Sequence, residues 1–172
     1  MRVVIRRPLR HPLHPEWAAT PARLAAGLCD ALSGSPKELL GAVEYGATAK
    51  HAVYALQYPD HPFLGREDRD ALWRKFEVPV FAMLLDRQGR LAAWECEAQD
   101  GMHIGGAWDD RALWVCRMLS SGWIRDDKAC ECGRSSDRIR LADSLRRAPA
   151  RADSLVITAL AVTNFSKKVV PA

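Results

Sequence analysis

The feature that most constrains the fold of this chain is an apolar run over 78–85. A short polar turn and a second strand-like run follow it. Residues 78–85 are apolar nearly throughout, which is typical of a strand buried on both faces of a sheet. The residues of 86–89 are polar and end in a glycine, and 90–97 again suits a strand. Together the two runs predict a β-hairpin, whose first strand needs other elements to cover it.

Capping signals predict two helices before this hairpin. Thr20 suits an N-cap and Pro21 the first helical position, and leucines recur at every fourth residue up to Gly34, which predicts a helix over this segment. Ser35 and Glu38 have the spacing of a capping box, and they predict a second helix ending near residue 46.

The remaining elements complete an α+β pattern. We expect strands over 2–5 and 155–165, a charged helix over 66–76 with Leu72, Trp73 and Phe76 on its inner side, a helix capped by Asp109 or Asp110, and a basic helix over 137–147. Residues 52–56 fit a helix or a strand. The order predicts a ferredoxin-like βαββαβ core with inserted helices, in a single α+β domain spanning 1–172.

Length and hydropathy bound the class of protein. A chain of 172 residues with 48% hydrophobic residues can bury a core without the help of a disulfide or a metal. No stretch has the roughly 18 to 20 uninterrupted apolar residues of a membrane helix, and Met1–Arg10 lacks the apolar region of a signal peptide. We therefore expect a cytoplasmic protein with no membrane partner.

The cysteines predict reduced thiols and one candidate metal site. Five cysteines are an odd number for a chain without a secretory signal, which argues against a disulfide framework. Cys130 and Cys132 form a C-x-C-G turn, and Cys116 lies upstream. With Cys96 or His103 as the fourth ligand, these three would hold a structural zinc, the one cofactor that we consider. The alternative is a loop with two free thiols.

Arginines gather near both ends of the chain and suggest a polyanionic partner. Residues 134–172 hold eight basic and three acidic residues. Arginine presents a rigid fork of donors that suits phosphate groups, although the same residues also suit a solvated surface. The candidate nucleic-acid-binding residues are Arg6, Arg7, Arg10, Arg134, Arg138, Arg140, Arg146 and Arg147, with Trp17 as a platform on which a base could stack.

Two alternatives to a simple binding role remain open. His11 and His14 lie in a loop beside arginines and could act as general base and acid in a metal-independent endoribonuclease; the alternative is that they are ordinary loop histidines. An acidic middle segment could instead engage a basic protein partner, as in an inhibitor or adaptor module, or it is a plain solvated surface. Its acidic residues are Glu95, Glu97, Asp100, Asp109 and Asp110.

One short segment resembles a family of RNA-binding proteins. Residues 16–24 read E-W-x-x-x-P-x-R-L, similar to the entry into the first helix of CRISPR-associated RAMP proteins that bind the repeat handle. The resemblance implies a ferredoxin-like domain that binds RNA within an effector complex, in some members with RNA cleavage.

Three other fragments are similar to pieces of phenylacetate-CoA ligases. They are residues 44–48, the segment ECEAQDGMHI over 95–104, and CECGR over 130–134. The chain lacks the Ser/Thr/Gly-rich phosphate loop and the catalytic lysine segment of that family, so we expect no adenylation. The sequence as a whole predicts a non-enzymatic, basic RNA-binding subunit of a larger assembly, with other protein subunits as further partners.

Overall fold

The computed structural model describes residues 9–58, 64–86, 88–105, 122–126, 128–134 and 137–141. The chain divides into two units, Met1–Leu141 and Ala142–Ala172, and every described residue belongs to the first. The strands predicted over 2–5 and 155–165, and the helix predicted after Asp109 or Asp110, lie outside the described residues.

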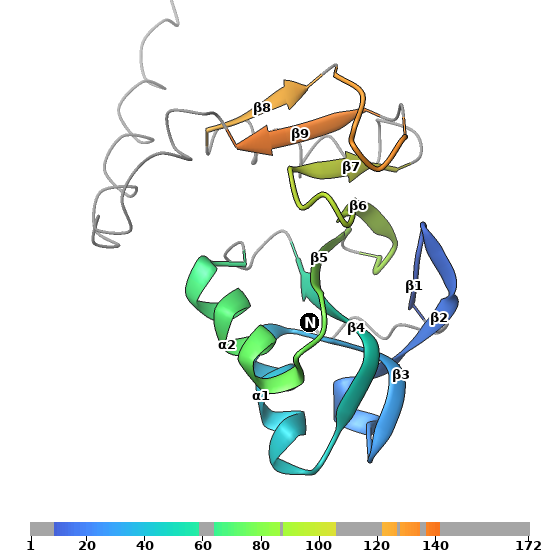
Figure 1. The fold of residues 1–172 in the computed structure, drawn as a ribbon, viewed down its shortest axis with the longest axis vertical. Helices are drawn as coiled ribbons and strands as arrows, with labels where there is room; N and C mark the ends of the chain where they lie inside the picture. The colour runs from blue at the N-terminus through green and yellow to red at the C-terminus, as the bar shows by residue number, and fades with distance from the viewer. Residues whose placement is uncertain are drawn as a thin grey trace, which may run out of the picture. The chain divides into compact units, whose positions relative to one another are not determined.

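The described residues form one mixed sheet of nine strands, in which neighbouring strands follow almost the order of the sequence: β1-β2-β3-β4-β5-β6-β7-β9-β8 (Figure 1). Strands β2 to β5 are parallel, and the remaining pairs are antiparallel. The strands are β1 (Leu9–His11), β2 (His14–Pro21), β3 (Leu28–Gly34), β4 (Thr48–Gln57), β5 (Val80–Leu85), β6 (Leu91–Glu95), β7 (Met102–Ile104), β8 (Trp123–Asp126) and β9 (Arg138–Leu141).

The capping box predicted at Ser35 is present and starts α1 (Pro36–Glu44). The Ser35 hydroxyl accepts a hydrogen bond from the amide of Glu38 at 3.3 Å, and the Glu38 carboxylate accepts one from the amide of Ser35 at 2.9 Å. Gly46 follows the helix at a φ of 77°, a conformation that glycine adopts without strain. The prediction of this helix is confirmed.

Helix α2 (Arg66–Phe76) has the bounds expected from the sequence. Leu72 and Phe76 are buried as predicted, but Trp73 is 57% exposed, so its expected inward position is wrong. Leu72 and Phe76 lie four residues apart and share one face of the helix, whereas the intervening Trp73 is turned about 100° away from Leu72.

The helix predicted between Thr20 and Gly34 is wrong. The segment instead completes β2, makes one turn of 3₁₀ helix, η1 (Ala22–Leu24), and continues as β3. A repeat of four residues is one helical turn and also two periods of a strand, so leucines at that spacing fit either structure. Pairing with strands on both sides decided the outcome, and Gly27 at a φ of 68° interrupts the segment.

Some predictions for the later elements are confirmed, and one is wrong. Residues 52–56, which fitted either structure, belong to β4. The predicted hairpin is confirmed as β5 and β6, in which Met83 pairs with Trp94, and Asp86 accepts hydrogen bonds from the amides of Gln88 and Arg90 in its turn. The basic helix predicted over 137–147 is wrong at its beginning, because 138–141 forms β9 between β7 and β8.

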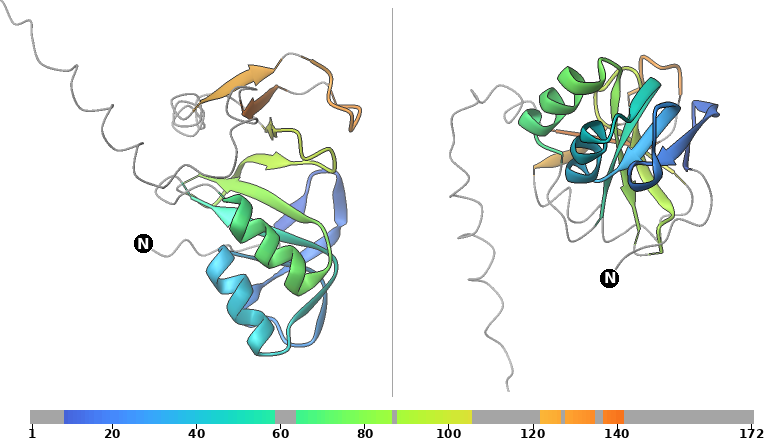
Figure 2. Two further views of the ribbon diagram at one scale, coloured as in Figure 1. Left: turned by 60° about the vertical axis from the view of Figure 1, so that its left-hand side comes forward. Right: turned by 90° about the horizontal axis from the view of Figure 1, so that it is seen from below.

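Apolar side chains fill both faces of the parallel strands. Helices α1 and α2 lie side by side over one face (Figures 1 and 2), where Leu32, Leu39, Val53 and Leu72 are in contact. The opposite face buries a second cluster of Tyr54, Leu56, Phe81, Met83 and Trp94. A smaller, alanine-rich cluster covers the antiparallel end and comprises Ala82, Leu84, Ala92, Ala93, Met102, Ile104 and Ile139.

The fold is therefore a mixed arrangement of strands and helices, as the predicted α+β class requires. A ferredoxin-like βαββαβ core is not confirmed, because the sheet has nine strands and the two helices connect three successive parallel strands. Among the described residues, no helix has the length and apolar character needed to cross a bilayer.

Candidate metal centre and the β1–β2 turn

Three chain segments bring cysteine and histidine side chains together at the antiparallel end of the sheet. Cys96 directly follows β6, and His103 lies on β7 opposite Trp94. The third segment is the turn over 130–134 between β8 and β9, in which the amide of Gly133 donates to the carbonyl of Cys130 at 2.9 Å. Gly133 has a φ of 80°, so glycine is the residue that closes this turn without strain.

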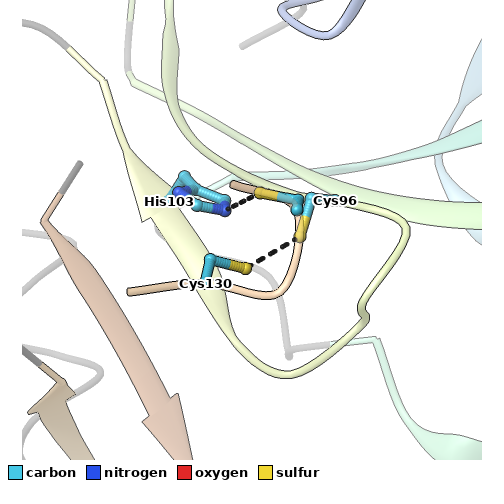
Figure 3. Close-up of side chains that lie close together, drawn as sticks. Cys96, His103 and Cys130 are labelled. Atoms are coloured by element: carbon cyan, nitrogen blue, oxygen red, sulfur yellow. Dashed lines mark hydrogen bonds between the residues drawn. The ribbon is translucent and has the colours of Figure 1, made fainter. Parts of the chain in front are cut away.

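The four side chains Cys96, His103, Cys130 and Cys132 form one compact group, which we call the Cys/His cluster. Their ligand atoms all lie within 4.8 Å of one another. The sulfurs of Cys96 and Cys130 are 3.5 Å apart, and the Cys132 sulfur is 3.3 Å from Nε2 of His103. Figure 3 shows Cys96, His103 and Cys130 directed toward a common point.

These distances suit a tetrahedral zinc site. With Zn–S bonds of about 2.3 Å and Zn–N bonds of about 2.0 Å, two ligand atoms of a tetrahedral ion lie roughly 3.5 to 3.8 Å apart. The separations of 3.5 Å and 3.3 Å in the cluster are close to that value. Three sulfurs and one imidazole nitrogen are also a donor set that zinc accepts in structural sites. The residues present therefore fit the ion.

The pKa values of the cluster act on metal binding in both directions, because a cysteine must lose its proton and a histidine must be neutral to bind zinc. Burial raises the pKa of the Cys96 thiol to about 12. Burial also raises the pKa of Cys130, but hydrogen bonds from Cys132, Cys96 and a nearby guanidinium outweigh it and bring the pKa below its ordinary value. Cys130 therefore ionises before Cys96. Burial, together with the charges of nearby arginines, lowers the pKa of His103 and keeps it neutral, as a ligand must be.

The cluster agrees in part with the predicted site. Cys130 and Cys132 belong to it as expected, and both Cys96 and His103 join them, whereas they were considered as alternatives for one position. Cys116 lies outside the described residues. No local signal showed that both belong, because His103 pairs with Trp94 and Cys96 lies beyond the end of β6.

The arginines of β9 are engaged in ion pairs beside this cluster. Arg138 is only 5% exposed and forms an ion pair with Asp126, with Asp100 at 3.8 Å. Nε of Arg140 lies 3.4 Å from the same Asp126 carboxylate. Burial and several neighbours act on the Asp126 carboxyl, and hydrogen bonds from Arg138 and Lys128 lower its pKa overall. Two of the predicted phosphate-binding arginines thus neutralise a carboxylate of the protein itself.

Two other predicted arginines contact residues 12–15, which comprise the turn after β1 and the first two residues of β2 and which we call the turn over 12–15. Arg10 donates a hydrogen bond to the carbonyl of Pro15, and Nη2 of Arg134 donates to the carbonyl of Pro12 at 3.1 Å. Both arginines are exposed. The structure therefore brings together two cations that are more than a hundred positions apart in the sequence. Arg6, Arg7, Arg146 and Arg147 lie outside the described residues.

Trp17 lies beside this turn, between two imidazole rings. Its ring centroid is 3.9 Å from that of His14 and 4.9 Å from that of His51, and the rings are nearly parallel, with interplanar angles of 8° and 7°. Both faces of the indole are therefore covered by histidines. A base stacking at this place would extend the row of rings or displace one of its members.

The two histidines considered for catalysis have different environments. His11 is completely buried; its Nε2 donates to the carbonyl of Glu95 at 2.7 Å, and its Nδ1 accepts from the amide of Leu13 at 3.1 Å. Burial lowers its pKa. A ring with both nitrogens engaged has no site for a proton from a substrate. His14 is bonded to Glu97 and lies 3.4 Å from Glu16.

The acidic segment is not a continuous surface. Glu95 is buried, and both oxygens of its carboxylate accept from Nη2 of Arg69 at 2.8 Å. One oxygen also accepts from the amide of Ala82 at 2.8 Å. Asp109 and Asp110 lie outside the described residues, and Asp100 is near Arg138.

Comparison with known proteins adds no relative, because no protein-family model matches the chain and no curated protein does.

Proposed function

We propose that this chain is a zinc-binding module in which Cys96, His103, Cys130 and Cys132 hold one structural zinc ion. The observation that carries the proposal is the convergence of these four ligand atoms within 4.8 Å. Four protein ligands complete a tetrahedron and leave no open coordination position for a substrate. The ion would therefore stabilise the fold rather than catalyse a reaction.

The position of the cluster explains why an ion is useful there. It connects the end of β6, strand β7 and the turn between β8 and β9. Among the described residues, the apolar cluster beneath this end of the sheet is the smallest of the three, so it buries less apolar area to stabilise the strands. A metal joined to three segments supplies a cross-link that a small core does not.

Metal content tests the proposal directly. We expect one zinc per chain by elemental analysis after purification without chelators, or after reconstitution with zinc and gel filtration. Cys130→Ser should lose the ion, because it removes a ligand of the cluster, whereas Cys29→Ser should retain it. Cys29 lies on β3, in contact with the apolar cluster under the helices. A chain that stays metal-free after reconstitution would overturn the proposal.

We also propose that the module binds single-stranded RNA as a non-enzymatic subunit of a larger assembly. One observation favours this second role: Arg10 and Arg134 both donate to carbonyls of the turn over 12–15, next to the row of His14, Trp17 and His51. Guanidinium groups beside stacked rings are what a strand with phosphates and unpaired bases requires.

Each guanidinium has five N–H donors, and one bond to a backbone carbonyl uses only one of them. Arg10 and Arg134 could therefore contact phosphates while keeping their places on the turn. Arg138 and Arg140 do not contribute to this surface in the proposal, because both form ion pairs with Asp126. The proposed RNA-binding site is thus smaller than the set of arginines at both ends of the chain that the sequence suggested.

The salt dependence of binding tests the RNA proposal. A fluorescently labelled, unstructured RNA should bind in low salt, and the slope of log affinity against log salt should decrease by about 0.7 for each phosphate that a variant no longer neutralises. Arg10→Gln with Arg134→Gln should weaken binding and reduce that slope. Arg74→Gln, on the exposed last turn of α2, is the matched control. Absence of binding in low salt, or equal binding by the double variant, would contradict the proposal.

A further inference from the structure

The three cysteines of the Cys/His cluster differ in exposure in a way that zinc binding alone does not require. Cys96 and Cys130 are 1% and 4% exposed, whereas Cys132 is partly exposed. One of the three cysteines is thus partly exposed, and the other two are buried. This is the arrangement of a reactive thiol with partners positioned to capture its oxidised form.

The two buried sulfurs are already in contact. The sulfurs of Cys96 and Cys130 are 3.5 Å apart, and a disulfide requires them to approach to about 2.05 Å. The two residues lie 34 positions apart and belong to different segments of the sheet, so a bond between them would cross-link separate segments. Cys130 and Cys132 are separated by a single residue and cannot supply such a cross-link.

Cys132 also reaches both of its neighbours. Its sulfur lies within 4.8 Å of the sulfurs of Cys96 and Cys130. A bond formed first on Cys132 can therefore be transferred inward without rearrangement of the strands.

We propose that the Cys/His cluster is a site of oxidation by hydrogen peroxide, in which Cys132 reacts first and a Cys96–Cys130 disulfide is the product. The Cys132 sulfur attacks one peroxide oxygen, so an S–O bond forms, the O–O bond breaks, and the second oxygen leaves as water after taking up a proton. The Cys96 sulfur then attacks the sulfur of the Cys132 sulfenic acid. The hydroxyl group of that sulfenic acid leaves as a second water.

Thiol–disulfide exchange completes the sequence. The Cys130 sulfur attacks Cys96 in the Cys96–Cys132 disulfide, and Cys132 leaves as a thiolate. In total, two thiols lose two protons and two electrons, and one peroxide takes them up to become two waters. The reaction consumes peroxide as the only oxidant, and a dithiol reductant reverses it.

Oxidation exchanges one cross-link for another. Zinc loses two thiolate ligands when Cys96 and Cys130 join, and the remaining Cys132 and His103 are too few to hold a structural ion. The covalent bond meanwhile keeps the end of β6 attached to the turn before β9. The release of zinc rests on the zinc-binding function proposed above, whereas formation of the disulfide does not.

Tryptic peptides separate the relevant cysteines and make the product identifiable. Cleavage after lysine and arginine places Cys96 in residues 91–111 and both Cys130 and Cys132 in residues 129–134. Cys116 falls in residues 112–117, and Cys29 in residues 24–37. Mass spectrometry without reduction therefore distinguishes the expected cross-link from every pairing that involves the other two cysteines.

The experiment treats the zinc-loaded full chain with hydrogen peroxide and follows zinc release with a chromogenic chelator. We expect one zinc released for each cross-link between 91–111 and 129–134. Fragmentation of the cross-linked peptides in the mass spectrometer should show that Cys96 is joined to Cys130. Brief treatment with dimedone should label Cys132 within 129–134. With all proteins compared in the metal-free form, Cys132→Ser should slow cross-linking by about tenfold, because it removes the partly exposed thiol, and Cys29→Ser should leave the rate unchanged.

The outcomes separate the two proposals. A chain that binds zinc but forms no such cross-link, or that forms one to 112–117 instead, overturns the oxidation proposal and leaves zinc binding intact. A chain that binds no zinc but forms the cross-link overturns zinc binding and supports oxidation of the metal-free cluster. If Cys132→Ser fails to fold, dimedone labelling of the unaltered chain decides which sulfur reacts first, and labelling of Cys96 or Cys130 contradicts the proposed order.

Discussion

In the parallel half of the sheet, β2 to β5, apolar side chains fill both faces, whereas the antiparallel half, β6 to β9, buries charged and sulfur-containing side chains. The parallel half contains Leu32, Val53, Tyr54 and Phe81, all at most 1% exposed. The antiparallel half instead buries Glu95, Cys96, His103, Cys130 and Arg138. Burial of apolar area stabilises the first half, while the second contains buried ion pairs and the cluster that we propose to hold zinc.

The comparison teaches that one continuous sheet can have two kinds of stabilisation. Among the described residues, no helix covers the antiparallel strands, and the Cys/His cluster and the arginine–carboxylate pairs lie beside their smaller apolar cluster. Changes to these polar groups should therefore act on the antiparallel half first.

Removal of the metal should have the largest effect. Structural zinc sites contribute on the order of 10 kcal/mol to the stability of small domains, so chelation should unfold the antiparallel half. Hydrogen exchange should then show loss of protection in β7 and β9 and retained protection in β4. Equal loss in both halves would show that the sheet unfolds as a single unit and that the division is wrong.

Arg69→Met should have the second-largest effect on stability. Arg69 on α2 is the ionic partner of Glu95 on β6 and joins the two halves. Burial raises the pKa of Glu95, and Arg69 opposes this effect; without its partner the buried carboxylate should cost about 3 kcal/mol. Urea unfolding measures the loss. A second substitution, Glu95→Gln, should recover part of it, and a double variant no more stable than Arg69→Met would contradict the pairing.

Leu72→Ala should destabilise the parallel half without affecting the metal. Leu72 is completely buried on α2, and such truncations cost about 2 to 4 kcal/mol. Thermal unfolding should show the loss, while zinc content stays at the level of the unaltered chain. Loss of zinc from this variant would mean that the two halves do not fold independently.

The smallest effect should be a dependence on pH that arises from His11. Its pKa is lowered from 6.5, chiefly by burial, so the unfolded chain binds a proton more readily than the folded one. The stabilisation is complete above pH 6.5 and is lost as the pH falls from there through the lowered pKa of the folded state.

Unfolding free energies between pH 7.5 and pH 5, in roughly half-unit steps, measure this loss. His11→Asn should remove part of the slope. His103 contributes in the same direction in metal-free protein, so the comparison is made on the zinc-loaded chain. An unchanged slope would assign the acid sensitivity to other groups.

Parts of the fold and of the site could be predicted because their signals are local. The capping box at Ser35, the charged pattern of α2 and the polar turn at Asp86 each act within a few residues, and all three elements form as expected. The site was found in part for the same reason, because Cys130 and Cys132 lie in one tight turn. Cys96 and His103 could be proposed as partners, but no local signal showed that both belong.

The amino-acid sequence by itself determined where the chain turns after β5, where α1 and α2 begin, and which residue types are able to bind zinc. These features depend on turn chemistry, capping and residue type. Only the tertiary structure decided that the leucine-rich segment over 28–34 and the basic segment over 138–141 are strands, because their conformation follows from hydrogen bonds to neighbouring strands. It also decided which arginines meet a carboxylate and which reach the turn over 12–15, since electrostatic partners are chosen by proximity in space.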